Sequence, residues 1–351
     1  MNTTPHPTLR PLRALLATAL LLAAQAGQAH TGLTVLNPAD GGPPVTVVYP
    51  SDAPPRPERV GWLVQPLARD GEPVPGNGRL VVLSHGSGGN PWVHLDLARR
   101  LSDAGFVVAF PQHQGDHQGD PSRPGPDSWT RRPAEVSRAI DAVLADPRWQ
   151  RLAGTPIGLW GMSAGGHTAL SLAGGRWSPA RFARHCDEHL DEDFAFCVGL
   201  ATRLTGSPLD GLRRLLARQV IGHRFGADER LREDRDPRLA AIVAEVPAAA
   251  DFEPASLARP AVPLGLVNAL QDRWLAPRFH GLRVLQGCTG CEDLATVPQG
   301  GHGMGLSPQP PLADPLLIEL LGDPPGFDRA TEVPAAQARV VAFFRRHLAP
   351  D

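Results

Sequence analysis

The chain has 351 residues, of which 42% are hydrophobic and 20% charged, and its formal net charge is −2. These values predict a globular protein built as one α/β domain, with room for an insertion. The near-neutral charge and the single tyrosine argue against nucleic-acid binding, which needs basic and aromatic surface. All 34 residues counted as Lys+Arg are arginine, which excludes mechanisms that depend on a lysine side chain.

The N-terminus resembles an export signal. Arg10 and Arg13 precede an apolar run over residues 14–24, and small residues follow at which cleavage can occur. The run is shorter than the roughly 20 apolar residues of a membrane span, although an uncleaved anchor is the alternative. We expect a signal peptide over residues 1–29 and a periplasmic or secreted chain over residues 30–351, without stable membrane insertion.

Export would place the four cysteines in an oxidising compartment. The pairing most local in sequence joins Cys186 to Cys197 and Cys288 to Cys291. The second pair has the C-x-x-C spacing of redox and zinc sites, but it lacks a thioredoxin-like context and further ligands at matching spacing. The sequence therefore predicts two structural disulfides and no metal site.

The first third of the chain predicts a sheet edge followed by buried strands. Short strands are expected over residues 34–36, 44–49 and 59–64, as an antiparallel meander. A more apolar strand over residues 79–84 leads into the sequence HGSGG, a helix over residues 91–104 and a strand over residues 106–110. The histidines and aspartate of the next loop, residues 112–117, favour hydrogen-bonded turns over a metal site.

Ser163 lies between Gly161 and Gly165 in a G-x-S-x-G pattern. An apolar strand over residues 157–160 precedes it and a helix over residues 164–173 follows, which is the context of a nucleophile elbow. In such a turn the glycines let the strand and the helix approach closely, and the serine hydroxyl projects over the end of the sheet. The sequence therefore predicts Ser163 as a nucleophile.

Residues 176–236 differ in character from the rest, because they are rich in arginine, aspartate and glutamate. An amphipathic helix is expected over residues 209–220, with Leu212, Leu215 and Leu216 on one stripe. The segment is predicted to be a helical insertion at the sheet edge. It could be a lid that lines a substrate pocket, or a helical excursion that never contacts substrate.

The remaining chain alternates strands with helices. Residues 134–145 read as the crossover helix before the elbow, residues 238–246, 263–269 and 294–297 as strands, and residues 334–347 as the closing helix. This alternation predicts a mainly parallel sheet with helices on both faces.

Two polar residues after the late strands complete a Ser, Asp, His order. Asp272 follows the strand over residues 263–269, and His302 lies in a glycine-rich loop after the last strand. This is the chain order of the α/β-hydrolase triad, in which histidine takes the serine proton and a carboxylate orients the histidine. Glu245 and Asp251 stay open as alternative acids, because they follow the preceding strand. For the oxyanion hole we expect the backbone amides of Ser87 and Ala164.

The sequences HGSGG at residues 85–89, GMSAGG at residues 161–166 and GGH at residues 300–302 together resemble the dienelactone-hydrolase-like branch of the α/β-hydrolase superfamily, which is similar to platelet-activating-factor acetylhydrolases. The likeness covers about residue 49 to the C-terminus. It implies a serine carboxylester hydrolase without a cofactor, with Ser163, Asp272 and His302 at the triad positions. Dienelactone hydrolases proper carry cysteine where this chain has Ser163, so lactone cleavage is not implied.

The expected function is hydrolysis of small to medium acyl esters through an acyl-enzyme, without an obligate protein partner. A catalytically silent binding protein with the same fold is an alternative. Peptidase or perhydrolase activity is another, because fold and triad do not fix the acceptor or the leaving group.

Overall fold

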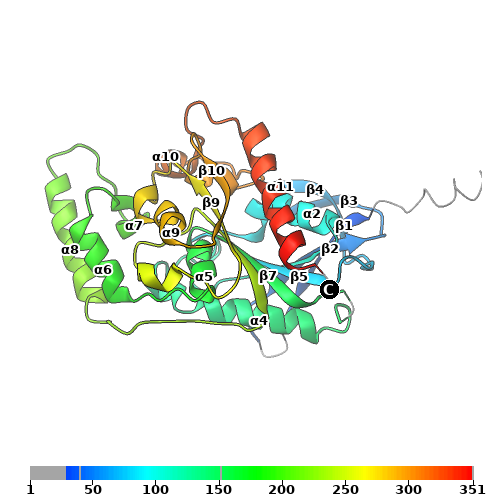
Figure 1. The fold of residues 1–351 in the computed structure, drawn as a ribbon. Coiled ribbons are helices and arrows are strands. Elements are labelled where there is room, and N and C mark those ends of the chain that lie inside the picture. The colour runs from blue at the N-terminus through cyan, green and yellow to red at the C-terminus, as the bar shows by residue number, and fades with distance from the viewer. Residues whose placement is uncertain (1–28, 39–40, 151, 350–351) are drawn as a thin grey trace, which may run out of the picture.

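The computed structural model describes residues 29–38, 41–150 and 152–349 (Figure 1). The predicted signal peptide over residues 1–29 lies outside this part of the chain, apart from its last residue. No helix in the described ranges combines the length and the apolar character needed to cross a membrane.

In the described part of the chain, ten strands form one sheet. Their bounds are β1 His30–Leu36, β2 Val45–Ser51, β3 Arg56–Val60, β4 Leu63–Arg69, β5 Arg79–Ser84, β6 Val107–Pro111, β7 Gly154–Met162, β8 Leu239–Glu245, β9 Leu264–Ala269 and β10 Glu292–Val297.

The helices connect these strands or extend from them. Their bounds are α2 Leu95–Asp103, α3 Pro126–Trp129, α4 Arg132–Ala145, α5 Ala164–Leu172, α6 Pro179–Glu188, α7 Phe194–Val198, α8 Asp210–Phe225, α9 Gly281–Gly287, α10 Pro315–Leu321 and α11 Arg329–His347. Short 3-10 helices are η1 Pro91–His94, η2 Pro254–Leu257, η3 Pro277–Phe279 and η4 His302–Gly305.

The sheet order is β10-β9-β8-β7-β5-β6-β2-β1-β4-β3, and the six strands from β10 to β6 are parallel. Parallel register brings the carboxyl ends of these strands to one edge: Ser84 pairs with Gly161, and Val297 pairs with Ala269. The segments that follow β5, β7, β9 and β10 carry the candidate catalytic and oxyanion residues. These segments therefore meet at this edge of the sheet.

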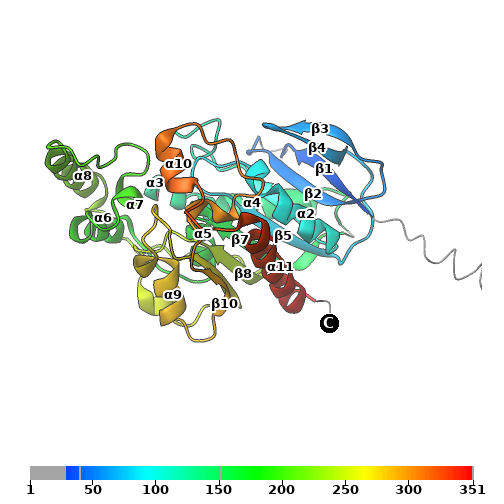
Figure 2. The ribbon, with the colours of Figure 1, turned by 90° about the horizontal axis from the view of Figure 1, so that it is seen from above.

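Helices cover both faces of the parallel strands (Figures 1 and 2). On one face lie α2 and α11, and on the other lie α4 and α5. Successive residues of the central strand β7 point to opposite faces, so that Leu159 packs in the core under α4 and α5, whereas Trp160 packs in the core under α2 and α11. A mainly parallel sheet covered on both faces is thus confirmed.

The prediction for the sheet edge was wrong in two respects. The strand expected over residues 59–64 spans a turn, because Gly61 adopts φ +58 between β3 and β4. A positive φ suits glycine, so the chain reverses at that residue. The edge is also not a simple meander, since β1 pairs antiparallel with β2 but parallel with β4.

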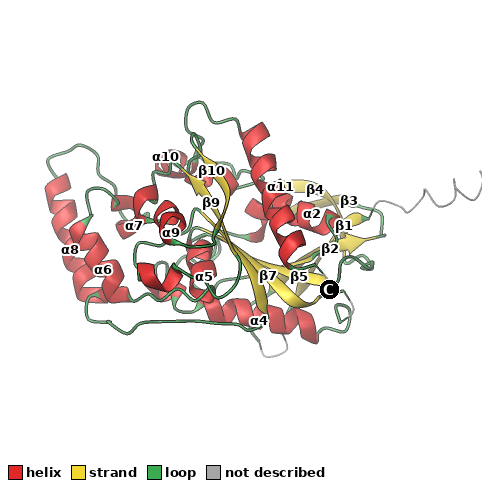
Figure 3. Ribbon diagram, viewed as in Figure 1, coloured by secondary structure: helices red, strands yellow, loops and turns green. Residues whose placement is uncertain are grey.

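The segment over residues 176–236 is helical, and α6 and α8 lie side by side at one end of the molecule (Figure 3). The helix expected over residues 209–220 is α8, which continues to Phe225. Its leucines at 212, 215 and 216 are each more than half exposed, whereas Ala217 and Ile221 are buried. The stripe therefore faces solvent, so these leucines do not line a buried substrate pocket.

Both predicted disulfides are confirmed. Cys186 of α6 is bonded to Cys197 of α7, and Cys288 is bonded to Cys291 after α9. The first bond ties two helices of the segment over residues 176–236 together, and the second closes the short turn that leads into β10.

The closing helix begins five residues earlier than the sequence predicted. The side chain of Asp328 accepts hydrogen bonds from the Ala330 and Thr331 amides and caps α11, so the helix starts at Arg329. Pro334, where the sequence predicts the helix to begin, lies inside its first two turns. An aspartate at the N-cap is the sequence signal for the earlier start.

Two glycines with opposite surroundings test the packing of β7 against α11. An added Cβ at Gly158 would lie 2.7 Å from the Phe344 ring and 2.9 Å from Leu348. We therefore expect Gly158→Ala to lower the free energy of unfolding by about 1–3 kcal/mol. Gly222 of α8 is exposed, and a Cβ there meets nothing within 4 Å.

For Gly222→Ala we accordingly expect a gain of about 0.5–1 kcal/mol, because alanine favours helix more than glycine does. Urea denaturation of both variants measures the difference. Equal effects of the two substitutions would contradict this account of the packing.

Candidate active site

Ser163 lies at the turn between β7 and α5, with φ 57 and ψ −114. Its neighbours must be glycine: a Cβ on Gly161 would lie 2.0 Å from the Gly165 carbonyl oxygen, and one on Gly165 would lie 1.9 Å from the Ser84 carbonyl oxygen. The Ser163 amide donates to the Glu245 carbonyl at 3.0 Å, which holds the turn against the end of β8. This is the geometry of a nucleophile elbow.

The structure brings Ser163, His302 and Asp272 into one hydrogen-bonded chain. His302 Nδ1 lies 2.7 Å from Asp272 Oδ2, and His302 Nε2 lies 3.0 Å from Ser163 Oγ. Because a carboxylate only accepts, Nδ1 carries the proton, and Nε2 is left to accept from the serine hydroxyl. Both Asp272 and His302 are buried, whereas Ser163 is only half-buried.

Backbone groups fix the second oxygen of Asp272. Its Oδ1 accepts from the amides of Trp274 and Leu275, each at 2.8 Å. The Trp274 ring lies beside His302, with 5.3 Å between ring centroids. Both carboxylate oxygens therefore have partners, and the side chain is held toward the histidine.

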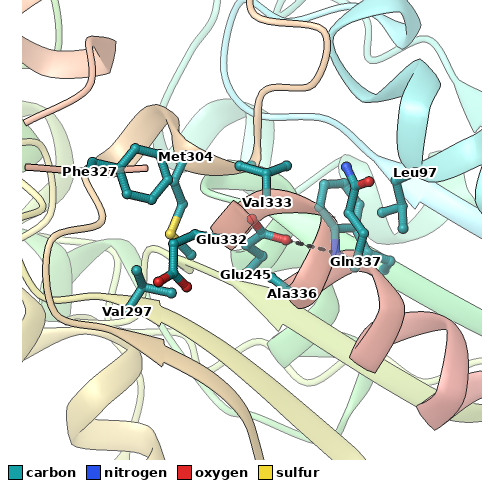
Figure 4. A pocket seen from close by; sticks show the side chains of 11 residues that line it. Leu97, Glu245, Val297, Met304, Phe327, Glu332, Val333, Ala336 and Gln337 are labelled. Carbon is teal, nitrogen blue, oxygen red and sulfur yellow. Dashed lines mark hydrogen bonds between the residues drawn. The ribbon is translucent and has the colours of Figure 1, made fainter. Parts of the chain in front are cut away.

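Neither alternative acid contacts His302. Asp251 Oδ2 lies 3.0 Å from His167 Nε2 in a fully buried pair. Glu245 accepts from Trp160 Nε1 at 3.2 Å and lines a small cavity together with Val333 and Met304 (Figure 4). The β8 pleat explains the second case, because it turns Glu245 toward the face covered by α2 and α11 rather than toward the strand edge.

The glycine-rich loop after β5 lies directly against the serine. A Cβ on Gly86 would be 3.4 Å from Ser163 Cβ and 3.9 Å from its Oγ. The amides of Gly88 and Gly89 are used within the structure, by Asp116 Oδ1 and the Gly86 carbonyl. In the described ranges the Ser87 amide has no protein acceptor.

The other predicted oxyanion donor begins a helix. Ala164 is the first residue of α5, and the first amides of an α-helix have no acceptor within the helix. The two amides chosen from the sequence therefore have the chemical character of oxyanion donors. Their catalytic role stays a prediction.

A second Ser, His, acid chain, which the sequence does not predict, begins at the end of β5. Ser84 Oγ lies 2.8 Å from His113 Nε2, and His113 Nδ1 lies 2.7 Å from Glu135 Oε2. Ser84 and His113 are fully buried and Glu135 nearly so. Burial, followed by the charges of Arg132 and His117, holds the pKa of His113 well below its usual value.

Neither a protein-family model nor a curated protein matches the sequence. Among solved structures, the ferulic acid esterase from Streptomyces cinnamoneus is similar, with a TM-score of 0.54 and 21% sequence identity over 93% of this chain and 92% of that chain. This likeness spans nearly the whole length of both chains. The protein has an α/β-hydrolase fold.

Within this hydrolase fold, one cluster has the residue types of a metal site. His185, Asp193 and His280 are buried, and their possible ligand atoms lie within 4.8 Å of one another. However, His280 Nδ1 accepts from the Ala249 amide at 2.9 Å, so its Nε2 carries the proton. A protonated Nε2 cannot bind a metal, and it donates to Asp193 instead.

Asp193 is the centre of a complete hydrogen-bond network. Its Oδ2 lies 2.8 Å from Nε2 of both His185 and His280, and its Oδ1 accepts from the Ala276 amide at 2.9 Å. Burial alone would raise the pKa of Asp193, but these partners together hold it well below its usual value. The network ties the segment over residues 176–236 to the loop that follows Asp272.

Two cavities adjoin the site and differ in size. The one beside Glu245 measures about 10 Å³, close to the smallest space that holds one water molecule. A wider cleft of about 280 Å³ is lined by His302, Gln271 and Arg273 and by residues of α10. Only the wider cleft has room for part of a substrate.

Glu245 makes stability depend on pH. Burial raises the pKa of this carboxyl from 4.5 to about 7, and the Trp160 hydrogen bond only partly opposes it. Between pH 4.5 and about 7, the Glu245 carboxyl is therefore protonated in the folded state and ionised in the unfolded state. The contribution of Glu245 to stability is complete below pH 4.5 and falls by about 3 kcal/mol as the pH rises to about 7.

Glu245→Gln should remove this fall, because glutamine does not titrate. We expect the difference in unfolding free energy between the variant and the wild type to shift in favour of the variant as the pH rises from 4.5 to 7. Urea denaturation of both proteins across that range measures the difference. The buried residues His94 and His85 are present in both proteins, so their titration cancels in it. A constant difference would contradict the proposed burial of the acid.

Proposed function

We propose that the protein is an exported serine carboxylester hydrolase that acts through an acyl-enzyme. The observation that carries the proposal is the hydrogen-bonded chain from Asp272 through His302 to Ser163, in which only the serine is open to solvent. A serine hydroxyl is a weak nucleophile until a base can take its proton, and this arrangement supplies both the base and the group that orients it.

In the proposed reaction, Ser163 Oγ attacks the ester carbonyl carbon while His302 Nε2 takes its proton. The Ser87 and Ala164 amides stabilise the oxyanion of the tetrahedral intermediate. His302 then gives the proton to the leaving alcohol as the carbon–oxygen bond breaks. Water attacks the acyl-enzyme with His302 again as base, which releases the acid and restores the serine.

Small to medium acyl esters are the proposed substrates. The similar fold of a ferulic acid esterase supports ester cleavage and makes aromatic acyl groups a class to include. The half-buried Trp274 ring beside His302 offers an apolar wall for such a group. A panel of p-nitrophenyl esters of increasing chain length, together with methyl ferulate, identifies the preferred acyl group.

Export is part of the proposal. Two disulfides are typical of an oxidising compartment, and the residues before the fold have the pattern of a signal peptide. The hypothesis of a silent binding protein predicts a displaced or missing catalytic group. The three side chains are in contact, so this alternative has no observation in its favour.

Ser163→Ala should abolish labelling by a fluorophosphonate and lower ester turnover by roughly 10⁴-fold or more, because the nucleophile is removed. Ser84→Ala is the matched control, since Ser84 has the same hydrogen-bond geometry to a histidine but is fully buried. The control should retain labelling. Labelling lost only in the Ser84 variant, or absent from the wild type, would refute the assignment.

Asp272→Asn should lower kcat by roughly 10³- to 10⁴-fold, because asparagine favours the wrong histidine tautomer. Glu245→Gln and Asp251→Asn should each leave kcat within about fivefold of the wild type, since neither residue contacts His302. Steady-state kinetics on the preferred p-nitrophenyl ester compare the three variants. Near-normal turnover of the Asp272 variant would show that another residue orients His302.

A further inference from the structure

A fully buried ion pair lies beneath the loop after β5. Arg132 Nη2 lies 2.8 Å from Asp116 Oδ2, and the side chains of both residues are completely buried. Burial of two charges is expensive, and such pairs contribute little to stability compared with apolar groups of the same size. The partners of these two side chains therefore indicate what the pair does.

Arg132 directs its donors to backbone carbonyls of the loop. Its Nη1 donates to the His85 carbonyl at 2.5 Å, and its Nη2 lies 3.4 Å from the Gly86 carbonyl. The Gly86 carbonyl also accepts from His85 Nδ1 at 2.7 Å and from the Gly89 amide at 3.1 Å. Three donors thus fix the direction of one peptide carbonyl.

The fixed carbonyl determines where the Ser87 amide points. The Gly86 carbonyl and the Ser87 N–H belong to the same peptide group, and in a trans peptide they point in opposite directions. Because the carbonyl is held toward buried Arg132, the N–H is directed away from it. The same loop backbone contacts Ser163, since an added Cβ on Gly86 would lie 3.4 Å from the serine Cβ.

Asp116 contacts the loop on the carboxyl-terminal side of the Ser87 amide. Its Oδ1 accepts from the Ser87 hydroxyl at 2.5 Å and from the Gly88 amide at 3.1 Å. The Gly88 amide is thereby removed from competition for the oxyanion. The carboxylate and the guanidinium therefore hold residues on both sides of the peptide group that carries the Ser87 N–H.

We propose that Asp116 and Arg132 are positioning residues that aim the Ser87 N–H at the oxyanion of the tetrahedral intermediate. This inference rests on the proposed esterase function. The pair acts through the loop backbone and touches no reacting atom. Its contribution is therefore made in the transition state and leaves the binding of the ground-state ester nearly unchanged.

Asp116→Asn tests the proposal, because it keeps the shape of the side chain and removes its charge. We expect kcat to fall about 10- to 100-fold with KM changed less than about threefold. The affinity for an aryl trifluoromethyl ketone, which forms an oxyanion adduct with Ser163, should fall by a similar factor. A destabilised fold alone would not weaken this adduct selectively.

Asp236→Asn is the matched control. Asp236 is a buried carboxylate paired with Arg238 at 2.6 Å, but it lies just before β8, at the amino end of the strand, far from the loop. Its kcat and ketone affinity should equal those of the wild type. Should Asp116→Asn fail to fold, Ser87→Ala removes only the side-chain hydroxyl that donates to Asp116, and it should lower kcat about 3- to 10-fold.

The outcomes separate the two proposals. An active wild type together with an Asp116 variant of unchanged kcat and ketone affinity overturns the positioning role and leaves the esterase assignment intact. Equal losses in the Asp116 and Asp236 variants also overturn it. A wild type without Ser163-dependent turnover overturns the esterase function, and the inference falls with it.

Discussion

The backbone conformation of Ser163 is the constraint on which the site depends. A positive φ in a residue with a Cβ costs about 1–3 kcal/mol, so the surrounding structure must hold it in place. The end of β8 does so, since the Ser163 amide donates to the Glu245 carbonyl and the Ala248 amide donates to the Ser163 carbonyl. Glycine at 161 and 165 leaves the space in which this turn fits.

Two buried carboxylates hold loops of the site in place. Asp193 links the helices of residues 176–236 to the loop after Asp272, through His280 and the Ala276 amide. Asp116 contacts the loop after β5 in a comparable way. In both places a buried carboxylate accepts a hydrogen bond from a backbone amide and so fixes the conformation of a loop.

The sequence was sufficient for the parallel strands and for the three residues that meet at the sheet edge. Strands β5 to β9 are built around apolar runs, and parallel register brings their carboxyl ends and that of β10 together at one edge. It favoured Asp272 as the acid but did not exclude Glu245, because the position of Glu245 depends on which face of β8 its side chain takes. Nor could it show that Arg132 is buried, since arginine is rarely without solvent exposure.

The buried chain from Ser84 to Glu135 differs from the chain at Ser163 in the exposure of its serine to solvent. Its hydrogen bonds are as short as those at Ser163, so contact with a histidine is not sufficient. Ser84 ends a regular strand, with its hydroxyl enclosed by the core, and an ester carbonyl cannot reach it. Ser163 follows its strand by one residue and turns out of it with positive φ. The backbone turn, rather than the side-chain partners, leaves Ser163 partly exposed to solvent and Ser84 enclosed.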